Sequence, residues 1–316
     1  MKVQETPKLK ESPSNDVPLK TQRTSGFLLR YELEDFLSAK SQVSVHTLRS
    51  YRQKLSKFIE WLEENTEVEE LEDLERAHIR AFLRFLQENH APGGVHFYFR
   101  SLRVWIRWAQ REYGFEDWDP LCNVQAPRLI QNPYPPASME DIRRLLKACD
   151  RRTNVGIRND ALIRFLLDTG VRASEVVRLR VRDVDLTTGD VRLPAEATKT
   201  KKARIVFLGK SALRSLRRFL NRRGAGDDES LFGLQYFGIS SALHALAETA
   251  GLEKPVTCHM IRKTYATESH RHGEDLETLR RKLGHGSLLV TQRYLGLNED
   301  DLRRAHKEHS PGDRLL

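Results

Sequence analysis

Residues 259–296 read HMIRKTYATESHRHGEDLETLRRKLGHGSLLVTQRYLG and contain a histidine, an arginine three residues later, a histidine before a glycine, and a tyrosine near the end. His259 and Arg262 share one face if the segment is helical, so both side chains can point at one place. A guanidinium donates two parallel, always-charged hydrogen bonds, which suits a phosphate. With His285 and Tyr294 following, the segment indicates a phosphate site with a hydroxyl nucleophile.

A second arginine stands upstream, in LLDTGVRASEVVRL. Arg172 follows a Thr-Gly turn and precedes a helix, so its position is held rigidly. Two arginines on one phosphate would match its charge and leave the phosphorus electrophilic. Tyr294, with a pKa of about 10 in water, needs cations or a base before it can attack, and Lys199 of TKTKK is a candidate proton donor. Taken singly, each residue has an ordinary structural explanation, so only the combination carries weight.

The composition indicates a basic chain of about two domains. Against 44 Asp and Glu, 53 Lys and Arg give a formal charge of +9 and a pI of 9.5. This charge suits a polyanion but does not separate DNA from RNA or anionic lipid. Three widely spaced cysteines, no apolar run of about 20 residues, and no signal-peptide core predict a reduced, cytoplasmic setting without a membrane span.

The first half of the chain predicts a tail followed by a helical bundle. Residues 1–25 are polar with hardly any large apolar side chain, and we expect a mobile tail. Apolar residues then recur at three- and four-residue intervals, as Leu48, Tyr51 and Leu55 show, which predicts amphipathic helices. The expected helices cover residues 27–40, 44–65, 76–89 and 95–114.

A proline-rich segment, APRLIQNPYPPAS, follows the bundle and favours extended backbone. Ser138 at its end is an expected helix N-cap. Downstream, helical patterns flank two β-rich pieces, DVRL and ARIVFL, which we expect to form a small sheet. From Ile239 the pattern is helical again, and a short helix is expected over residues 299–308.

Two basic stripes lie on the predicted bundle. Arg100, Arg103 and Arg107 share one helical face, and Arg49 and Arg52 share another. A solvated surface held by intrahelical ion pairs explains many such stripes. Few carboxylates interleave with the arginines of the third and fourth helices, which favours contact with phosphates.

Three motifs in order give the chain a close resemblance to the tyrosine recombinases, the phage-integrase and Xer-type family. The family's Thr-Gly-hydrophobic-Arg box matches TGVRASEVVRL, with Arg172 as the first catalytic arginine. Its His-x-x-Arg box matches HMIRKTYAT, with His259 and Arg262. Its Leu-Gly-His box, with a Thr shortly before the tyrosine, matches LGHGSLLVTQRY, with His285 and Tyr294. The resemblance runs from about residue 27 to the end.

The resemblance also covers the predicted hairpin. Family members carry a lysine five residues before an arginine that opens a hydrophobic strand, and Lys199 stands five residues before Arg204 of RIVFLG. Lys201 and Lys202 stand in the same cluster and are the alternatives for that role. The resemblance assigns the lysine to protonating the leaving oxygen of the DNA strand.

The family's mechanism implies roles for the other residues. Tyr294 would attack a DNA phosphodiester and form a 3′-phosphotyrosine, while Arg172 and Arg262 stabilise the transition state. His259 would act as acid and base with the tyrosine, and His285 would hydrogen-bond the phosphate. The covalent link retains the bond energy, which agrees with a sequence that has no P-loop for ATP and no carboxylate cluster for a metal ion. Glu175 is expected to support the site rather than to catalyse.

The family's architecture implies a mainly α fold with a small β-sheet, in which a helical SAM-like core-binding domain and a catalytic domain form a C-shaped clamp on double-stranded DNA. We predict a tail over residues 1–25, a core-binding domain over 26–126, a linker over 127–137 and a catalytic domain over 138–316, with a C-terminal tail from about 297. A tail this short at the N-terminus favours a simple Xer-like member or a transposon or plasmid member. The resemblance implies nucleoid association, a tetramer on paired sites, and in some cases a second recombinase or an accessory protein. The C-terminal tail docks on its own chain or on a neighbour.

Two other classes remain open at this point. A type IB topoisomerase shares the tyrosine and the phosphate pocket but relaxes supercoils without exchanging strands. A DNA-binding protein that kept the fold and cuts nothing is the third class, although the intact set of six residues argues against it. The biological role, among integration, excision, inversion and dimer resolution, stays open.

Overall fold

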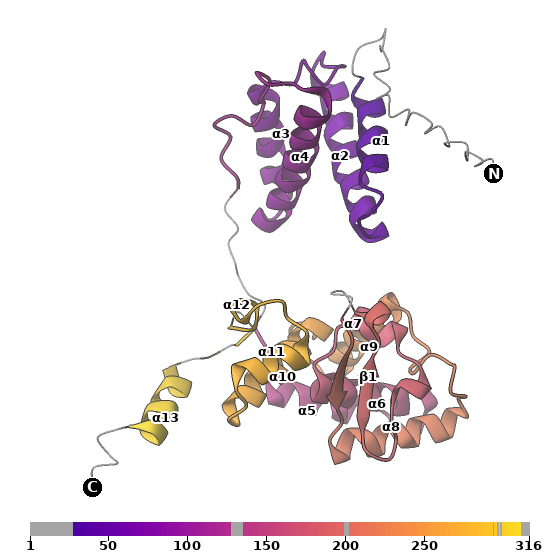
Figure 1. Cartoon of the computed structure of the whole chain (residues 1–316). Coiled ribbons are helices and arrows are strands. Elements are labelled where there is room, and N and C mark those ends of the chain that lie inside the picture. Colours follow the sequence, from indigo (N-terminus) through magenta and orange to yellow (C-terminus); the bar gives the residue numbers. More distant parts are fainter. Residues whose placement is uncertain are drawn as a thin grey trace, which may run out of the picture. The chain divides into compact units, whose positions relative to one another are not determined.

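The computed structural model describes residues 28–127, 135–198, 202–292, 294–295, 297 and 299–310. The chain divides into two compact units, residues 1–132 and 133–316 (Figure 1). The expected tail over residues 1–25, most of the predicted linker, and Lys199 lie outside the described residues.

The first unit is a bundle of helices, as the apolar periodicity predicts. Its apolar side chains gather in one core, in which Phe36, Phe58, Phe82 and Trp105 are fully buried. The helices are α1 (Leu29–Ala39), α2 (Val45–Asn65), α3 (Arg76–Asn89) and α4 (Pro92–Tyr113). α4 begins three residues before the expected start, because Pro92 occupies the first turn, where a helix needs no backbone N–H.

In the second unit, helices surround a two-stranded antiparallel sheet. The pieces DVRL and ARIVFL form it: β1 (Asp190–Leu193) pairs with β2 (Arg204–Phe207), with Asp190 opposite Phe207. The mainly α fold with a small sheet is therefore confirmed. The helices are α5 (Met139–Ala148), α6 (Asn154–Thr169), α7 (Ala173–Arg178), α8 (Lys210–Arg223), α9 (Tyr236–Thr249), α10 (Cys258–Arg271), α11 (Leu276–Leu283), α12 (Leu288–Gln292) and α13 (Glu299–His309).

The predicted cap at the start of α5 is also confirmed. The Ser138 hydroxyl accepts from the Asp141 N–H at 3.0 Å, and the Asp141 carboxylate accepts from the Ser138 N–H at 3.3 Å. This reciprocal pair satisfies two backbone donors that have no partner inside the helix. The sequence thus sets where the second unit's first helix begins.

Helix α6 is the central helix of the second unit and packs against both α8 and α10. It ends at Gly170, whose φ of +58° is left-handed. A Cβ at Gly170 would lie 2.3 Å from Cδ1 of Tyr265 on α10, so only glycine allows this close approach. The approach brings α10 against the short loop that leads to Arg172.

The C-terminal helix α13 contacts its own chain. Nε and Nη2 of Arg271, at the end of α10, donate to the two carboxylate oxygens of Asp301, each at 2.9 Å. Leu302, the next residue, is 66% exposed. Across the described ranges, no helix is both long enough and apolar enough to cross a membrane.

Candidate active site

Arg172 stands directly before α7 and is held by the first turn of that helix. Its backbone N–H donates to Glu175 Oε2 at 2.8 Å, and its Nη1 donates to Glu175 Oε1 at 3.0 Å. Glu175 is fully buried. Burial raises the pKa of that carboxyl, but hydrogen bonds and positive charge from Arg204 and Arg172 outweigh burial, so the pKa lies below its usual value. A charged carboxylate therefore orients Arg172.

Arg262, on α10, is 2% exposed and is the most deeply buried of the predicted catalytic residues that the structure describes. Nη1 donates to the carbonyl of Gly170 and Nη2 to the carbonyl of Leu283, each at 2.5 Å. Burial and the charge of Arg172 lower its pKa to about 9, so it stays charged at neutral pH. Its Nε, also buried, has no hydrogen-bond partner among the described residues. A buried charged donor without an acceptor is suited to an anion.

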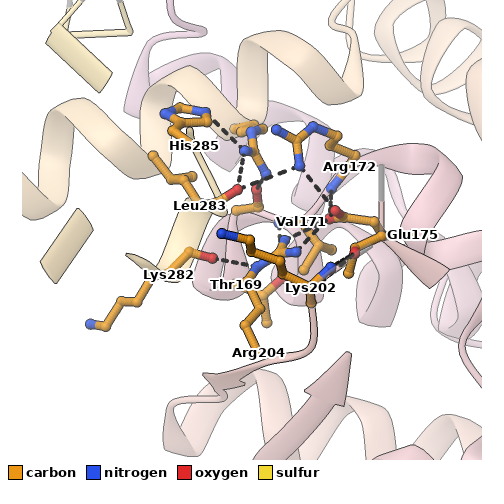
Figure 2. A network of polar contacts seen from close by, with 12 residues as sticks. Thr169, Val171, Arg172, Glu175, Lys202, Arg204, Lys282, Leu283 and His285 are labelled. Atoms are coloured by element: carbon orange, nitrogen blue, oxygen red, sulfur yellow. Dashed lines mark hydrogen bonds and ion pairs between the residues drawn. The ribbon is translucent and has the colours of Figure 1, made fainter. Parts of the chain in front are cut away.

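Arg172 and Arg262 both donate to the Leu283 carbonyl, at the end of α11. Figure 2 shows Arg172 and Leu283 at this point. Arg172 Nη1 lies 3.5 Å and Arg262 Nη2 lies 2.5 Å from that oxygen. The guanidinium groups thus converge although they come from different elements. This is the arrangement that two arginines on one phosphate require.

His285 lies two residues beyond Leu283 and is 5% exposed. Its Nε2 is 3.0 Å from Arg262 Nη2 and its Nδ1 is 3.1 Å from Thr291 Oγ1. Because a guanidinium only donates, Nε2 is the acceptor and Nδ1 carries the proton. Burial and the charges of Arg262 and Arg172 lower the pKa of His285 to about 3, so the ring is neutral. In this state His285 orients Arg262, whereas donation to a phosphate requires the proton on Nε2.

Tyr294 lies beside both histidines and above Arg262. Its hydroxyl is 3.4 Å from Nδ1 of His259, and its ring centroid is 5.7 Å from the Arg262 guanidinium carbon. The His285 ring centroid is 4.6 Å from that of the tyrosine. Burial, and then Lys263 and Arg262, lower the pKa of His259. A neutral His259 at physiological pH is positioned to accept the tyrosine proton.

The loop that carries Lys199 joins β1 to β2, and its ends are described. Thr198 Oγ1 accepts from the Lys202 N–H at 3.1 Å and donates to the Lys202 carbonyl at 3.0 Å, which ties the two ends together. Lys202 lines a cavity of about 340 Å³ together with Arg204 and His285. The predicted role of Lys199 stays a prediction, and Lys202 is the described lysine of the cluster that lies beside the site.

Two residues beyond the predicted set belong to this neighbourhood. Lys263 is buried beside Arg262, with Nζ 6.0 Å from the Tyr294 ring centroid. Arg204 binds Glu175 through two hydrogen bonds, at 3.0 and 2.7 Å. The sequence offered a signal for each: Lys263 directly follows Arg262, and Arg204 opens the strand after the lysine cluster. Neither signal specified a contact.

The five arginines predicted to bind DNA all lie exposed on α2 and α4 of the first unit. Arg52 donates from Nη2 to Glu34 on α1 at 2.7 Å and is paired with that carboxylate. Arg107 donates to Gln110 at 2.8 Å and to Asp119 at 3.3 Å. Their contact with DNA stays a prediction, and two of the five are already engaged by acceptors in the free chain.

Family models match both units. The model of the phage integrase family matches residues 138–300, and the model of the phage integrase N-terminal SAM-like domain matches residues 31–112. The first match covers more than half of the chain and includes the whole arrangement from Arg172 to Tyr294. The chain therefore belongs to the phage integrase family, whose members are DNA breaking and rejoining recombinases.

Relatives match over nearly the full chain. Tyrosine recombinase XerD of Listeria monocytogenes is 29% identical over 295 residues, which are 88% of this chain and 98% of the relative. Tyrosine recombinase XerC 2 of Ralstonia nicotianae is 30% identical over 287 residues, 85% of this chain and 81% of the relative. The family resemblance found in the motifs is thus confirmed, including its Xer type.

Solved structures share the fold. A lambda integrase (75-356) dimer bound to a COC′ core site matches with a TM-score of 0.70 at 17% identity, over 85% of this chain and 95% of that chain. The XerH site-specific recombinase bound to palindromic difH substrate, in a post-cleavage complex, matches with a TM-score of 0.68 at 20% identity, over 89% and 84%.

Proposed function

We propose that this chain is a site-specific recombinase in which Tyr294 cuts one DNA strand and holds it covalently. The tyrosine oxygen bonds to the scissile phosphorus as the bond from phosphorus to the 5′-oxygen breaks. The products are a 3′-phosphotyrosine and a 5′-hydroxyl, and rejoining reverses the step with another strand's 5′-hydroxyl. The observation that carries the proposal is the convergence of Tyr294, His259 and Arg262, with the tyrosine hydroxyl 3.4 Å from a histidine nitrogen and its ring 5.7 Å from a buried guanidinium.

The arginines supply the transition-state stabilisation. Attack on the phosphodiester gathers negative charge on the nonbridging oxygens, and fixed cations in a site shielded from water stabilise that charge most effectively. Arg172 is held by Glu175, and Arg262 is held by two carbonyls while its Nε lacks a protein acceptor in the described chain. Both are therefore oriented before DNA arrives.

Proton transfer falls to the remaining residues. His259 takes the proton of Tyr294 during attack, because its lowered pKa keeps the ring neutral. Lys199, or one of the alternatives Lys201 and Lys202 in the same sequence cluster, protonates the leaving 5′-oxygen. His285 holds Arg262 through Nε2 and hydrogen-bonds the phosphate when that nitrogen carries the proton. The attack itself uses no nucleotide and no metal ion.

Double-stranded DNA is the proposed partner. Residues 26–126 form the core-binding domain and residues 138–316 the catalytic domain, and together they close on the duplex as a clamp. The charge of +9 supports this partner, as do the names of the structural matches, a lambda integrase dimer on a core site and XerH on difH. Strand exchange then takes place in a tetramer on paired sites, with a second recombinase or an accessory protein in some settings. The chain acts in the cytoplasm, on the nucleoid.

The experiment that tests this function begins with covalent complexes trapped in cells. Protein-linked DNA is purified after denaturation, and its ends are sequenced to give the site. The second step uses a duplex that contains this site and a nick beside the cleavage position. Cleavage releases the short fragment with the 5′-hydroxyl, so rejoining fails and the adduct accumulates. We expect adduct formation at an unchanged rate in excess EDTA and without nucleotide, measured as a shifted band on a denaturing gel. A requirement for Mg²⁺ in cleavage would place the chain in another mechanistic class, and relaxation of supercoils without strand exchange would indicate a type IB topoisomerase.

The DNA contacts of the first unit give a separate prediction. Arg100 and Arg103 are exposed on α4, and replacing both with Gln removes two cations. Affinity for the site should fall, and the slope of log K against log salt should become shallower by up to about 1.8, because each neutralised phosphate adds about 0.9 to that slope. The readout is a gel-shift titration at several salt concentrations. Replacing Arg143 and Arg182, which are exposed and paired with Glu140 and Asp228, removes the same charge and serves as the control. Equal slopes for the two double variants would contradict the assignment.

A further inference from the structure

We propose that Arg204 is a positioning residue for cleavage, which neutralises Glu175 so that the charge of Arg172 stays available to the scissile phosphate. The proposal rests on the proposed function, because it assigns a task within the same site. In the sequence, Arg204 is marked only as the residue that opens a strand after the lysine cluster. Its contacts in the folded chain indicate a role in the site.

The Arg204 side chain, 9% exposed, forms the centre of a buried network (Figure 2). Nη1 donates to Glu175 Oε1 at 3.0 Å and Nη2 donates to Glu175 Oε2 at 2.7 Å, which is a two-pronged contact. Its Nε donates to the Lys282 carbonyl at 2.8 Å. One guanidinium therefore joins β2 to α7 and to the end of α11.

The contact with Arg172 is weaker than this one. Glu175 receives a single side-chain hydrogen bond from Arg172, from Nη1 at 3.0 Å, beside the backbone N–H at 2.8 Å. Arg172 therefore has other guanidinium donors left for an anion, whereas Arg204 commits both of its terminal nitrogens to the carboxylate. Glu175 thus has its main charge partner in Arg204 and its lesser one in Arg172.

The charge balance follows from these contacts. Arg172, Arg204 and Arg262 supply three positive charges and Glu175 one negative charge, so the cluster keeps a net charge of +2 for a phosphate. Without Arg204 the net charge falls to +1. An unpaired buried carboxylate is costly, so Glu175 would draw Arg172 into a closed ion pair. The phosphate would then lose both a charge and an oriented donor.

The loop before His285 is built around the same side chain. Gly284 has a φ of +64°, and a Cβ there would lie 3.1 to 3.3 Å from Nη1, Cζ and Nε of Arg204. The guanidinium therefore packs directly on the backbone that leads to His285. A hydrophobic residue in place of Arg204 would fill this space but would supply no charge.

The test compares Arg204→Met with the double variant Arg204→Met/Glu175→Gln in the full-length chain, on the nicked duplex. Arg204→Met should lower the rate of adduct formation by roughly a hundredfold, with site affinity within about threefold of the unsubstituted chain. The double variant restores the net charge of +2 and should form the adduct at least about tenfold faster than Arg204→Met. If Glu175→Gln deepens the loss instead, Arg204 has only a structural task and the proposal is overturned.

A neutral substrate gives a second readout that folding defects do not move. In a methylphosphonate, a methyl group replaces one nonbridging oxygen, so the scissile group carries no charge in the ground state. The unsubstituted chain should cleave the ordinary duplex roughly a hundredfold faster than Arg204→Met does. On the methylphosphonate it should be less than about fivefold faster. The same ratio of the two rates on both substrates would overturn the charge argument. Arg204→Lys keeps the charge without the fork, so it should cleave the ordinary duplex faster than Arg204→Met, and it extends the test if the methionine variant does not fold.

The matched control is a second arginine on a buried carboxylate. Arg164 donates from Nε to Asp160 at 3.1 Å and from Nη1 to Ser211 at 2.6 Å, on the α6 to α8 side of the unit. Arg164→Met should lower Tm. The ratio of its cleavage rate on the ordinary duplex to its rate on the methylphosphonate should equal that of the unsubstituted chain. If the proposed function itself fails, the unsubstituted chain forms no adduct at all. If only this inference fails, the unsubstituted chain still forms the adduct, and only the rates of the Arg204 variants relative to it differ from expectation.

Discussion

We expect Tyr294→Phe to bind its site as tightly as the unsubstituted chain but to form no covalent adduct on the nicked duplex. The reason is that the substitution removes only the hydroxyl, which lies 3.4 Å from His259 Nδ1, and keeps the ring that covers Arg262. Loss of a nucleophile lowers the rate by at least about a thousandfold. Gel-shift affinity and adduct yield on a denaturing gel, from the same preparation, give the two measurements.

The matched control for this result is Tyr236→Phe, at a tyrosine that is 64% exposed at the start of α9. It should form the adduct in full yield. An undiminished adduct from Tyr294→Phe would show that another residue attacks the phosphate, and the assignment of the nucleophile would be wrong.

Arg172→Ala and Arg262→Ala should each lower cleavage by roughly 10²- to 10³-fold, with a smaller loss of affinity for the site. The reason is that each guanidinium meets more charge in the transition state than in the ground state. Arg172→Lys should recover little, because an ammonium has no fork to match two oxygens. Adduct rates at saturating enzyme, set beside gel-shift affinities, separate the two effects.

Stability has to be measured alongside these variants. Arg262 joins Gly170 to Leu283, so Arg262→Ala should also lower Tm, whereas Arg172 is part-exposed and should cost less. Arg178→Ala, in the same helix α7 as Glu175 but bonded outward to the Glu196 carbonyl at 2.8 Å, is the control for the helix. Near-normal cleavage by Arg172→Lys would count against two-pronged recognition of the phosphate.

Much of the fold followed from local signals in the sequence. Apolar spacing, as in Leu55, Phe58, Ile59 and Leu62 on α2, fixed the helices, because the side that faces the core must repeat with the turn of the helix. The change of period at DVRL predicted the sheet, and Ser138 after the proline-rich segment predicted the cap of α5. The start of α4 was missed because Gly93 and Gly94 have low helix propensity and carry no side chain to mark a face.

The sequence named residues that the fold brings together, but it did not specify the hydrogen bonds between them. Local motifs named Arg172, His259, Arg262, His285 and Tyr294, and the fold brings these five together. The bonds of Arg204 to Glu175, and of His285 to Arg262, join residues far apart in the chain. No local pattern specifies which acceptor a distant arginine meets. The tautomer of His285 likewise depends on Thr291 and Arg262 together, and only the folded chain sets both distances.

Each unit's own apolar core governs how the chain melts. Among the described residues, buried side chains between Leu29 and Leu121 form one cluster, those between Ala137 and Ile261 form another, and the clusters share no member. Units with separate cores need not melt at one temperature, so a single free energy of unfolding does not describe the chain. If the second unit melts first, cleavage is lost while the first unit is still folded. A preparation that warming has made inactive in this way would still hold a folded helical bundle, and if its exposed arginines bind DNA as proposed, it would compete with intact protein for the site.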